Sequence, residues 1–330
     1  MQPTDHETEL LIPLHVSYIK ALDTKVDSLA YHLTTHLRMN GVYWGLTALE
    51  IMGEPQVLDK DQLVRFVLSC WDDQNGGFGS FPNHDSHILS TLSAIQILAM
   101  KDSLHVLEER GMKQTLVSFI LSLQTPSGSF QGDKWGEEDT RFLYCSVSAL
   151  ALLGELDKLD RKRTVDHILR CGNFDGGFGR REGAESHSGQ VFVCVAALSI
   201  LESLDKVDVD KLGWWLCERQ LDNGGLNGRP QKLEDVCYSW WVLSSLSMIK
   251  RLDWINAEKL SAFILSAQDP EGGGIADRPD NVTDVFHTNF GVAGLSLLGY
   301  RGLKQVDPTY CLPSEVVQKL GIERDYQRKR

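Results

Sequence analysis

The sequence lacks several features that would assign it to common protein classes. Its longest apolar stretch, Val191–Leu201, is far shorter than the ~20 residues of a membrane-spanning helix, so no transmembrane segment is expected. Acidic residues outnumber lysine and arginine, and the net charge is −12. This argues against a nucleic-acid-binding protein, because such proteins normally present a broad basic surface. The N-terminal stretch Met1–Leu10 is polar and acidic, unlike a secretory signal.

Closely paired cysteines are also absent. The seven cysteines are scattered and form no C-x-x-C pair; they are Cys70, Cys145, Cys171, Cys194, Cys217, Cys237 and Cys311. This pattern is typical of a reducing compartment, so we expect a cytoplasmic protein. The composition, with 42% hydrophobic and 24% charged residues, is that of a folded globular protein with a substantial core.

A glycine-rich loop recurs five times along the chain. Its leading glycines are Gly76, Gly128, Gly176, Gly224 and Gly272. Their separations of 52, 48, 48 and 48 residues indicate a repeat architecture. A segment with apolar residues at i, i+3, i+4 and i+7 precedes the loops, as in Leu63, Phe66, Val67 and Cys70. Such a segment is typical of a surface helix with one buried stripe.

Six further segments are apolar almost all round, and five of them follow the glycine-rich loops. They are Val42–Met52, Leu89–Met100, Tyr144–Leu153, Phe192–Leu201, Tyr238–Met248 and Phe290–Leu298. Helices of this composition are buried on most sides. Alternating buried and exposed helices predict an all-α protein, an α/α barrel (toroid) of six inner and six outer helices. An open solenoid is the alternative, and closure is favoured because the buried helices show no polar concave face.

We expect one domain over residues 1–330, with short polar segments at about 1–15 and 312–330. Because every loop leads to the start of an inner helix, polar residues after the loops should gather at one mouth of the barrel. Those that differ between repeats are His187, Arg229, Lys232, Asp235, Cys237, Tyr238, Asp277, Asp284 and His287.

Three of these residues offer metal ligands. Asp235, Cys237 and His287 provide a carboxylate, a thiolate and an imidazole, a set that suits a zinc ion whose fourth position stays open for catalysis. Taken alone, the pair Asp235 and Cys237 is more often a helix-start acid beside a core cysteine. The repeat position of His287 favours the metal site over this interpretation.

The residues at this mouth resemble those of the β subunits of protein farnesyl- and geranylgeranyltransferases. The resemblance spans nearly the whole chain, and its most specific parts are Arg229-x-x-Lys232-x-x-Asp235-x-Cys237-Tyr238-x-x-Trp241 and Asp284-x-x-His287-Thr288. The third repeat departs from the family, because it reads His187-Ser188-Gly189-Gln190 where relatives carry His-Gly-Gly-Tyr. Within the family, the short chain is most similar to the Rab geranylgeranyltransferase β subunits.

The resemblance implies a role for each matching residue. Asp235, Cys237 and His287 would bind one Zn²⁺ per subunit, and a diphosphate clamp would be formed by Arg229, Lys232, His187 and Tyr238, with the backbone of Ser188 and Gly189 beside it. Trp241 would line the isoprenoid channel. Leu89 would stand where the farnesyl enzyme carries a bulky tyrosine, which would deepen the channel for a C20 lipid.

Other positions keep two interpretations. Asp277 matches a carboxylate that holds Mg²⁺ on the diphosphate in some relatives, and Asp284 could orient His287, but both could be solvated loop acids or helix caps. Arg141 could reach the mouth or pair with nearby acids. The aromatic residues Trp44, Tyr144, Phe192, Trp240, Trp241 and Phe290 could line a lipid tunnel or be ordinary core packing.

The resemblance also implies partners. The chain would form an obligate heterodimer with an α subunit and transfer a geranylgeranyl group from geranylgeranyl diphosphate to C-terminal cysteines of Rab GTPases, which a Rab escort protein presents. Alternatives are a farnesyl- or type I geranylgeranyltransferase β subunit, or a non-catalytic toroid that binds no zinc. A terpene cyclase is disfavoured, because the sequence lacks an acidic run such as Asp-x-Asp-Asp.

Overall fold

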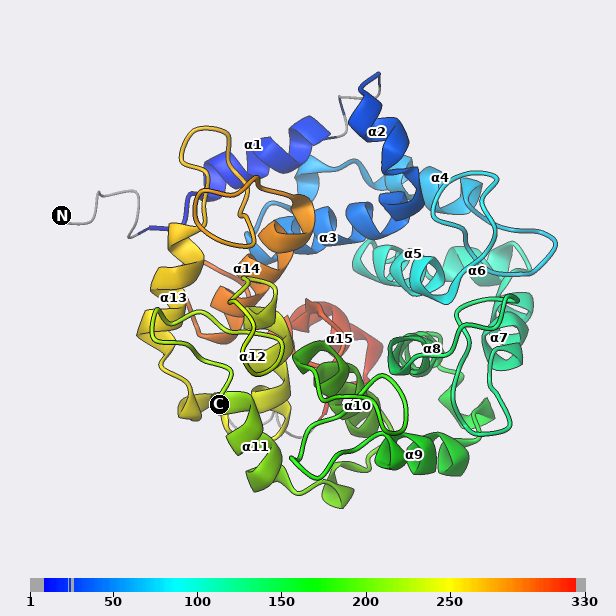
Figure 1. Ribbon diagram of the computed structural model, residues 1–330. Helices are drawn as coiled ribbons and strands as arrows, with labels where there is room; N and C mark the ends of the chain where they lie inside the picture. Colours follow the sequence, from blue (N-terminus) through cyan, green and yellow to red (C-terminus); the bar gives the residue numbers. More distant parts are fainter. Residues whose placement is uncertain (1–8, 23, 25–26, 325–330) are drawn as a thin grey trace.

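The computed structural model describes residues 9–22, 24 and 27–324, and these residues form two concentric rings of helices (Figure 1). The inner ring consists of α3 (Arg38–Ile51), α5 (Ile88–Met100), α8 (Thr140–Leu152), α10 (Ser188–Ile200), α12 (Tyr238–Met248) and α14 (Val285–Leu297). The outer ring consists of α1 (Ile12–Leu22), α4 (Lys60–Ser69), α7 (Lys113–Ser122), α9 (Arg161–Arg170), α11 (Val209–Cys217) and α13 (Ala257–Ser266). The predicted α/α barrel is therefore confirmed.

The inner ring is closed. Each inner helix packs against the next one along the chain, and the last, α14, packs against the first, α3. An open solenoid would leave these two helices apart, so the closed barrel is the correct alternative. Closure buries the inner helices on nearly all sides, which is why their sequences carry almost no polar stripe.

Helices α8, α10 and α14 begin four or five residues before the apolar segments that predicted them, and α5 begins one residue before. The side chains of His87, Asp139, His187 and Asp284 each accept a hydrogen bond from a backbone N–H group in the first turn of α5, α8, α10 and α14. These caps satisfy donors that would otherwise lack partners. Polar first turns are therefore part of the helices.

The outer helices carry similar caps. Asp59, Asp160, Asp208 and Asn256 accept backbone hydrogen bonds at the starts of α4, α9, α11 and α13. The sixth outer helix, α1, lies partly in the segment expected to be a polar N-terminal tail. His15 in α1 is fully buried, so the expected polar segment does not extend to residue 15; residues 1–8 lie outside the described residues.

The described part of the expected C-terminal tail, residues 312–324, folds against the barrel, and residues 325–330 lie outside the described residues. Strands β1 (Val306–Asp307) and β2 (Leu312–Pro313) pair antiparallel, with Val306 opposite Pro313, and α15 (Ser314–Leu320) follows. Leu312 and Val317 are fully buried. The hydroxyls of Tyr43 and Tyr144 donate to the backbone carbonyls of Cys311 and Thr309, so the turn of this hairpin is bound to the inner ring.

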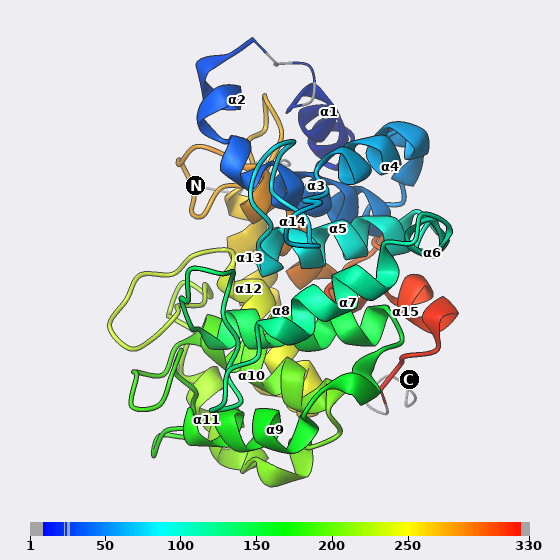
Figure 2. The same ribbon diagram turned by 90° about the vertical axis from the view of Figure 1, so that its right-hand side faces the viewer.

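Short helices complete the described chain. They are α2 (Leu29–Leu33), α6 (His105–Glu109) and the 3₁₀ helices η2 (Thr35–Leu37), η3 (Pro55–Val57), η4 (Leu156–Lys158), η5 (Leu204–Lys206) and η6 (Leu252–Trp254). Figure 2 shows the long loops that lead to the inner helices projecting from one side of the barrel, with α15 on the other side. The loop side is the predicted mouth.

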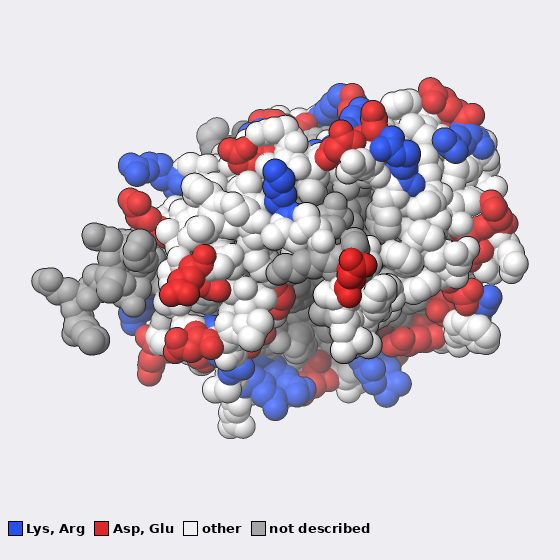
Figure 3. All heavy atoms as spheres, turned by 90° about the horizontal axis from the view of Figure 1, so that it is seen from above, with Lys and Arg blue, Asp and Glu red and all other residues white. Residues whose placement is uncertain are grey.

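The surface charge and the cysteines agree with what the sequence predicted, namely no broad basic surface and no paired cysteines. On the face seen in Figure 3, the acidic and basic side chains of the described residues are interspersed and form no broad basic surface. All seven cysteines are free thiols. Among the described residues, none of the helices has the length and apolar character needed to cross a membrane.

Candidate functional site

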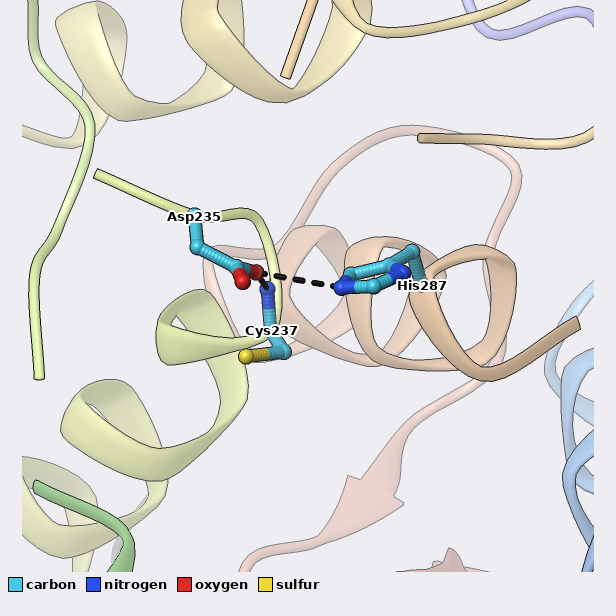
Figure 4. A group of neighbouring side chains, drawn as sticks. All are labelled: Asp235, Cys237 and His287. Carbon is cyan, nitrogen blue, oxygen red and sulfur yellow. Dashed lines mark hydrogen bonds and ion pairs between the residues drawn. The ribbon is translucent and has the colours of Figure 1, made fainter. Parts of the chain in front are cut away.

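Three side chains predicted as metal ligands meet at the mouth of the barrel (Figure 4). Asp235 and Cys237 precede α12, and His287 lies in the first turn of α14. One potential ligand atom from each residue lies within 4.8 Å of the other two. Ligands of a tetrahedral zinc ion, with bonds of 2.0–2.3 Å, lie roughly 3.5 Å apart. The three side chains therefore fit a zinc ion once their ligand atoms move about 1 Å closer together.

Hydrogen bonds fix the imidazole of His287. Its Nδ1 donates to Asp284 Oδ2 at 2.6 Å, and its Nε2 faces Asp235 Oδ1 at 3.2 Å. Burial alone would lower the pKa of His287, but the hydrogen bonds to Asp235 and Asp284 raise it to about 9. A metal at Nε2 would replace the proton that this nitrogen carries. A carboxylate on the other ring nitrogen is the usual support of a metal-binding histidine.

The pKa values of Asp235 and Cys237 are shifted in opposite directions. Burial would raise the pKa of Asp235, yet hydrogen bonds from His287 and Cys237 bring it below its ordinary value. Burial, followed by the nearby Asp235 carboxylate, raises the pKa of the Cys237 thiol well above its ordinary value. Without a cation the sulfur therefore keeps its proton, and a divalent ion would supply the charge needed to make it a ligand.

His187 and Tyr238 form a second polar cluster beside the metal ligands. The Tyr238 hydroxyl lies 3.3 Å from His187 Nε2, and the two rings meet edge to face. His187 Nδ1 accepts from the backbone N–H of Gly189, so the ring proton lies on Nε2. Burial, then the Arg229 charge, lowers the pKa of His187, while burial raises the pKa of Tyr238 to about 12. Both groups are neutral donors at pH 7.

Sequence reasoning missed Gly228 in this cluster. A Cβ atom built on Gly228 would lie 2.5 Å from Tyr238 Oη and 2.7 Å from His187 Nε2, so only glycine fits. Its carbonyl accepts from the backbone N–H of Ser188 at 2.8 Å and from the Ser188 hydroxyl at 3.1 Å. Its repeat position was a usable signal, since Gly132 stands at the same distance after Gly128.

The two cations of the predicted clamp lie in the loop before α12. Arg229 Nη1 pairs with Glu185 Oε2 at 2.5 Å, and the Arg229 side chain is 38% exposed. Lys232 is exposed, and its backbone carbonyl accepts from Asn227 Nδ2. These cations stand on the same loop as Gly228 and Asp235, and an anion at the mouth would have to draw Arg229 away from Glu185.

Asp277 and Arg141 already have partners. The Asp277 carboxylate accepts from Arg278 Nη2 at 3.1 Å and Asn281 Nδ2 at 2.8 Å. Arg141 donates to Asp139 through Nε at 3.0 Å and Nη2 at 3.1 Å. Arg141 therefore stands at the mouth, at the start of α8, and also pairs with a nearby acid.

Aromatic side chains connect five inner helices in a continuous chain. Successive ring centroids are 4.6 to 5.2 Å apart along the series Trp44, Phe286, Phe290, Trp241, Phe192 and Tyr144. Trp44, Phe286 and Trp241 keep partial exposure, whereas Phe192 is 2% exposed. Leu89 on α5 is also partly exposed. Phe286, the second ring of this chain, packs edge to face against His287.

Comparisons with known proteins find similarity over most of the chain. A family model described as the prenyltransferase alpha-alpha toroid domain matches residues 10–312. The geranylgeranyl transferase type-2 subunit beta of Saccharomyces cerevisiae is 58% identical over 313 residues, which cover 94% of this chain and 96% of that protein. The protein of the same name from Candida albicans is 52% identical over 319 residues, covering 92% and 93% respectively.

A solved structure shows the same fold. Candida albicans protein geranylgeranyltransferase-I complexed with GGPP aligns with a TM-score of 0.85, covering 95% of this chain and 99% of that chain. The sequence identity is 24%, so this likeness supports the fold alone.

Proposed function

Since this chain belongs to the family of geranylgeranyl transferase type-2 β subunits, which are prenyltransferase α–α toroid proteins, we propose that it is a zinc-dependent catalytic subunit. Its reaction would transfer a geranylgeranyl group from geranylgeranyl diphosphate to C-terminal cysteine thiols of Rab GTPases, forming a thioether. The observation that carries this proposal is the convergence of Asp235, Cys237 and His287 within 4.8 Å, beside the neutral donors His187 and Tyr238.

The ligand set supports a catalytic rather than a purely structural zinc site. Three protein ligands leave one tetrahedral position for a substrate sulfur. Zinc held by these three ligands would supply positive charge that lowers the pKa of the acceptor cysteine, so that its sulfur would be a thiolate at neutral pH. Asp284 holds the imidazole of His287, and Asp235 and Cys237 are joined by a hydrogen bond from the Cys237 N–H at 2.7 Å.

The clamp residues would stabilise the leaving group. As the bond between C1 of the isoprenoid and the diphosphate oxygen breaks, negative charge develops on the diphosphate. His187 Nε2 and the Tyr238 hydroxyl donate hydrogen bonds to it, and Arg229 and Lys232 supply positive charge. Gly228 keeps the space in front of His187 and Tyr238 open, because a side chain would overlap both groups.

The lipid would lie along the aromatic chain. Trp241, Tyr144 and their neighbours form the chain of rings against which the isoprenoid would pack. We propose that Leu89 leaves room there for a C20 chain. Asp277 is our candidate for Mg²⁺ binding, and this would require its carboxylate to release Arg278.

Partners follow from the family. Relatives are named as subunits, so we infer an obligate heterodimer with an α subunit and a Rab substrate presented by an escort protein. Free cysteines and the absence of a membrane-crossing helix among the described residues are compatible with our expectation that the complex works in the cytoplasm.

Metal analysis of Cys237→Ala tests the proposal. We expect the wild-type chain to hold one zinc ion and Cys237→Ala to lose it while remaining folded. Cys217→Ala is the matched control, because Cys217 is a half-buried cysteine on the outer helix α11. Equal zinc in Cys237→Ala and wild type would refute the ligand assignment and leave a non-catalytic toroid as the better interpretation.

A transfer assay identifies the substrate. The chain would be assayed with its α subunit, using C15 and C20 diphosphates and Rab acceptors with and without an escort protein. We expect transfer of the C20 group only when the Rab protein is presented by the escort. Transfer of either group to a short C-terminal peptide without an escort would instead indicate a farnesyl- or type I enzyme.

A further inference from the structure

The N-terminal helix α1 takes the place of the next outer helix for the fifth glycine-rich loop. In the other repeats, a loop glycine lies against the first turn of the following outer helix. A Cβ atom on Gly128 would lie 2.2 Å from the Arg163 carbonyl oxygen, and one on Gly224 would lie 2.4 Å from that of Lys259. Gly273 (φ +74°) stands in the same relation to Leu14 in α1, at 2.3 Å. Figure 1 shows α1 beside this loop.

A glutamine at the end of the outer helix makes a second recurring contact. Gln124 Nε2 donates to Thr164 Oγ1 on the next outer helix at 2.9 Å. The equivalent Gln268 accepts through Oε1 from His15 Nε2 at 2.9 Å and from the Leu11 N–H at 2.8 Å. His15 and Thr164 are both the fourth residue of their helices.

His15 differs from its counterparts in chemistry. The fourth residue of the remaining outer helices is leucine, namely Leu63, Leu116, Leu212 and Leu260. His15 is fully buried, and its Nδ1 accepts from the Gly274 backbone N–H at 2.9 Å. Because Nδ1 accepts, the ring is neutral and its proton on Nε2 is donated to Gln268. His15 therefore ties α1 to both the outer helix α13 and the fifth loop.

Tyr18 binds the other end of this loop. The seventh residue of the outer helices is aromatic or histidine, and in three of them it is Phe66, Phe119 or Phe263. Tyr18 occupies this position in α1, and its hydroxyl donates to the Thr283 carbonyl at 3.2 Å. Thr283 immediately precedes Asp284, the residue that holds His287. The hydroxyl thus adds a contact that phenylalanine cannot make.

The fifth loop in turn contacts both segments that carry the metal ligands. The backbone N–H of Val236, between Asp235 and Cys237, donates to the Asp277 carbonyl at 2.9 Å. At the far end of the loop, the Asp284 N–H donates to the Ile275 carbonyl at 3.3 Å. The loop therefore links α1 to all three ligands without contributing one itself.

We propose that His15 and Tyr18 are positioning residues of the metal centre, acting through the loop from Gly273 to Asp284 on Asp235, Cys237 and His287. The helix that closes the outer ring also sets the spacing of the ligands. This inference rests on the proposed function, because ligand spacing matters only if the site binds a metal.

The test compares His15→Leu, Tyr18→Phe and the double variant with Thr164→Val. The first two introduce residues that equivalent positions already carry, and Thr164→Val removes the equivalent contact to Gln124 in another repeat. In the full-length, metal-free chain we expect amide hydrogen exchange at Val236 and Asp284 to become about fivefold faster in the double variant. Zinc affinity should fall by about tenfold. Thr164→Val should change neither quantity.

Faster amide exchange at Gly274 in the double variant would show that the His15 contact is lost. If exchange at Val236 were nevertheless unchanged, the proposal would be overturned. If the double variant does not fold, Tyr18→Phe alone decides the matter through exchange at Asp284, because it removes a single hydroxyl. A wild-type chain without zinc affinity would contradict the proposed function, whereas the exchange measurement would still decide whether α1 positions the ligand segments.

Discussion

Asp284 contacts His287 twice, and the two contacts have different effects. Its Oδ1 accepts from the backbone N–H of His287 at 2.8 Å, and its Oδ2 accepts from the imidazole Nδ1 at 2.6 Å. One carboxylate therefore caps α14 and sets the direction of the imidazole ring. With Nδ1 occupied, Nε2 is the nitrogen that faces Asp235.

Asp284→Asn separates these two effects. An asparagine oxygen can still cap the helix, but it is not a charged acceptor for the imidazole. We expect the free energy of unfolding to stay within about 0.5 kcal/mol of wild type and zinc affinity to fall by about tenfold. Asp284→Ala should lose both effects. Chelator competition and urea unfolding measure the two quantities, and wild-type zinc affinity in Asp284→Asn would show that the carboxylate is only a cap.

Gly228→Ala should weaken the binding of geranylgeranyl diphosphate. The added methyl group would overlap Tyr238 Oη and His187 Nε2, so that the two donors must move apart. Gly132→Ala is the matched control, because its Cβ atom would lie 2.5 Å from His87 Nε2 in another repeat. We expect affinity for the diphosphate to fall by about tenfold or more in Gly228→Ala alone. Equal losses in both variants would indicate general distortion of the barrel.

Lys232→Ala should reduce diphosphate binding and leave zinc in place. A charge-assisted hydrogen bond contributes about 1.5–3 kcal/mol, so affinity should fall by about tenfold or more. Lys206→Ala serves as the control, because Lys206 is an exposed lysine in η5, which follows the C-terminal end of α10. Titration of the complex with geranylgeranyl diphosphate gives the affinities. Loss of zinc in Lys232→Ala would mean that the clamp is misplaced.

Leu89→Tyr should shift the preferred donor from C20 toward C15. A tyrosine at this partly exposed position of α5 would fill space that the end of the longer chain needs. The ratio of kcat/KM for the two diphosphates should change by about tenfold or more. Leu92→Tyr, one turn further along α5, is the comparison. An unchanged ratio in Leu89→Tyr would remove Leu89 from the channel.

The metal-free chain should become less stable as pH rises. The pKa of His287 is raised to about 9 by Asp235 and Asp284, above an unfolded value near 6.5. Its protonated ring therefore stabilises the fold fully below about pH 6.5, and this contribution, on the order of 2 kcal/mol, disappears as pH approaches 9. Urea unfolding in a chelator should show this decline. In His287→Gln the decline should be smaller. If stability fell identically with pH in this variant and in the wild type, ion pairing of His287 with Asp235 and Asp284 would be excluded.

Much of the architecture could be read from periodicity. The inner helices were predicted because burial on all sides removes the polar stripe, and the repeat spacing places their starts at one mouth. The first turns of α8 and α10 could not be read in this way, because cap residues such as Asp139 and His187 are polar. The role of α1 was missed for another reason: it lies outside the glycine repeat, and only its packing on the fifth loop identifies it as an outer helix.

By itself, the sequence determined the repeat, the two classes of helix and the identity of the three candidate ligands, because these depend on residue type and spacing along one chain. The tertiary structure decided what depends on distance between repeats. Closure through α3 and α14, the 4.8 Å convergence of Asp235, Cys237 and His287, and the space kept open by Gly228 all arise from contacts between distant segments. No local pattern encodes such contacts, because each is set by the packing of the whole ring.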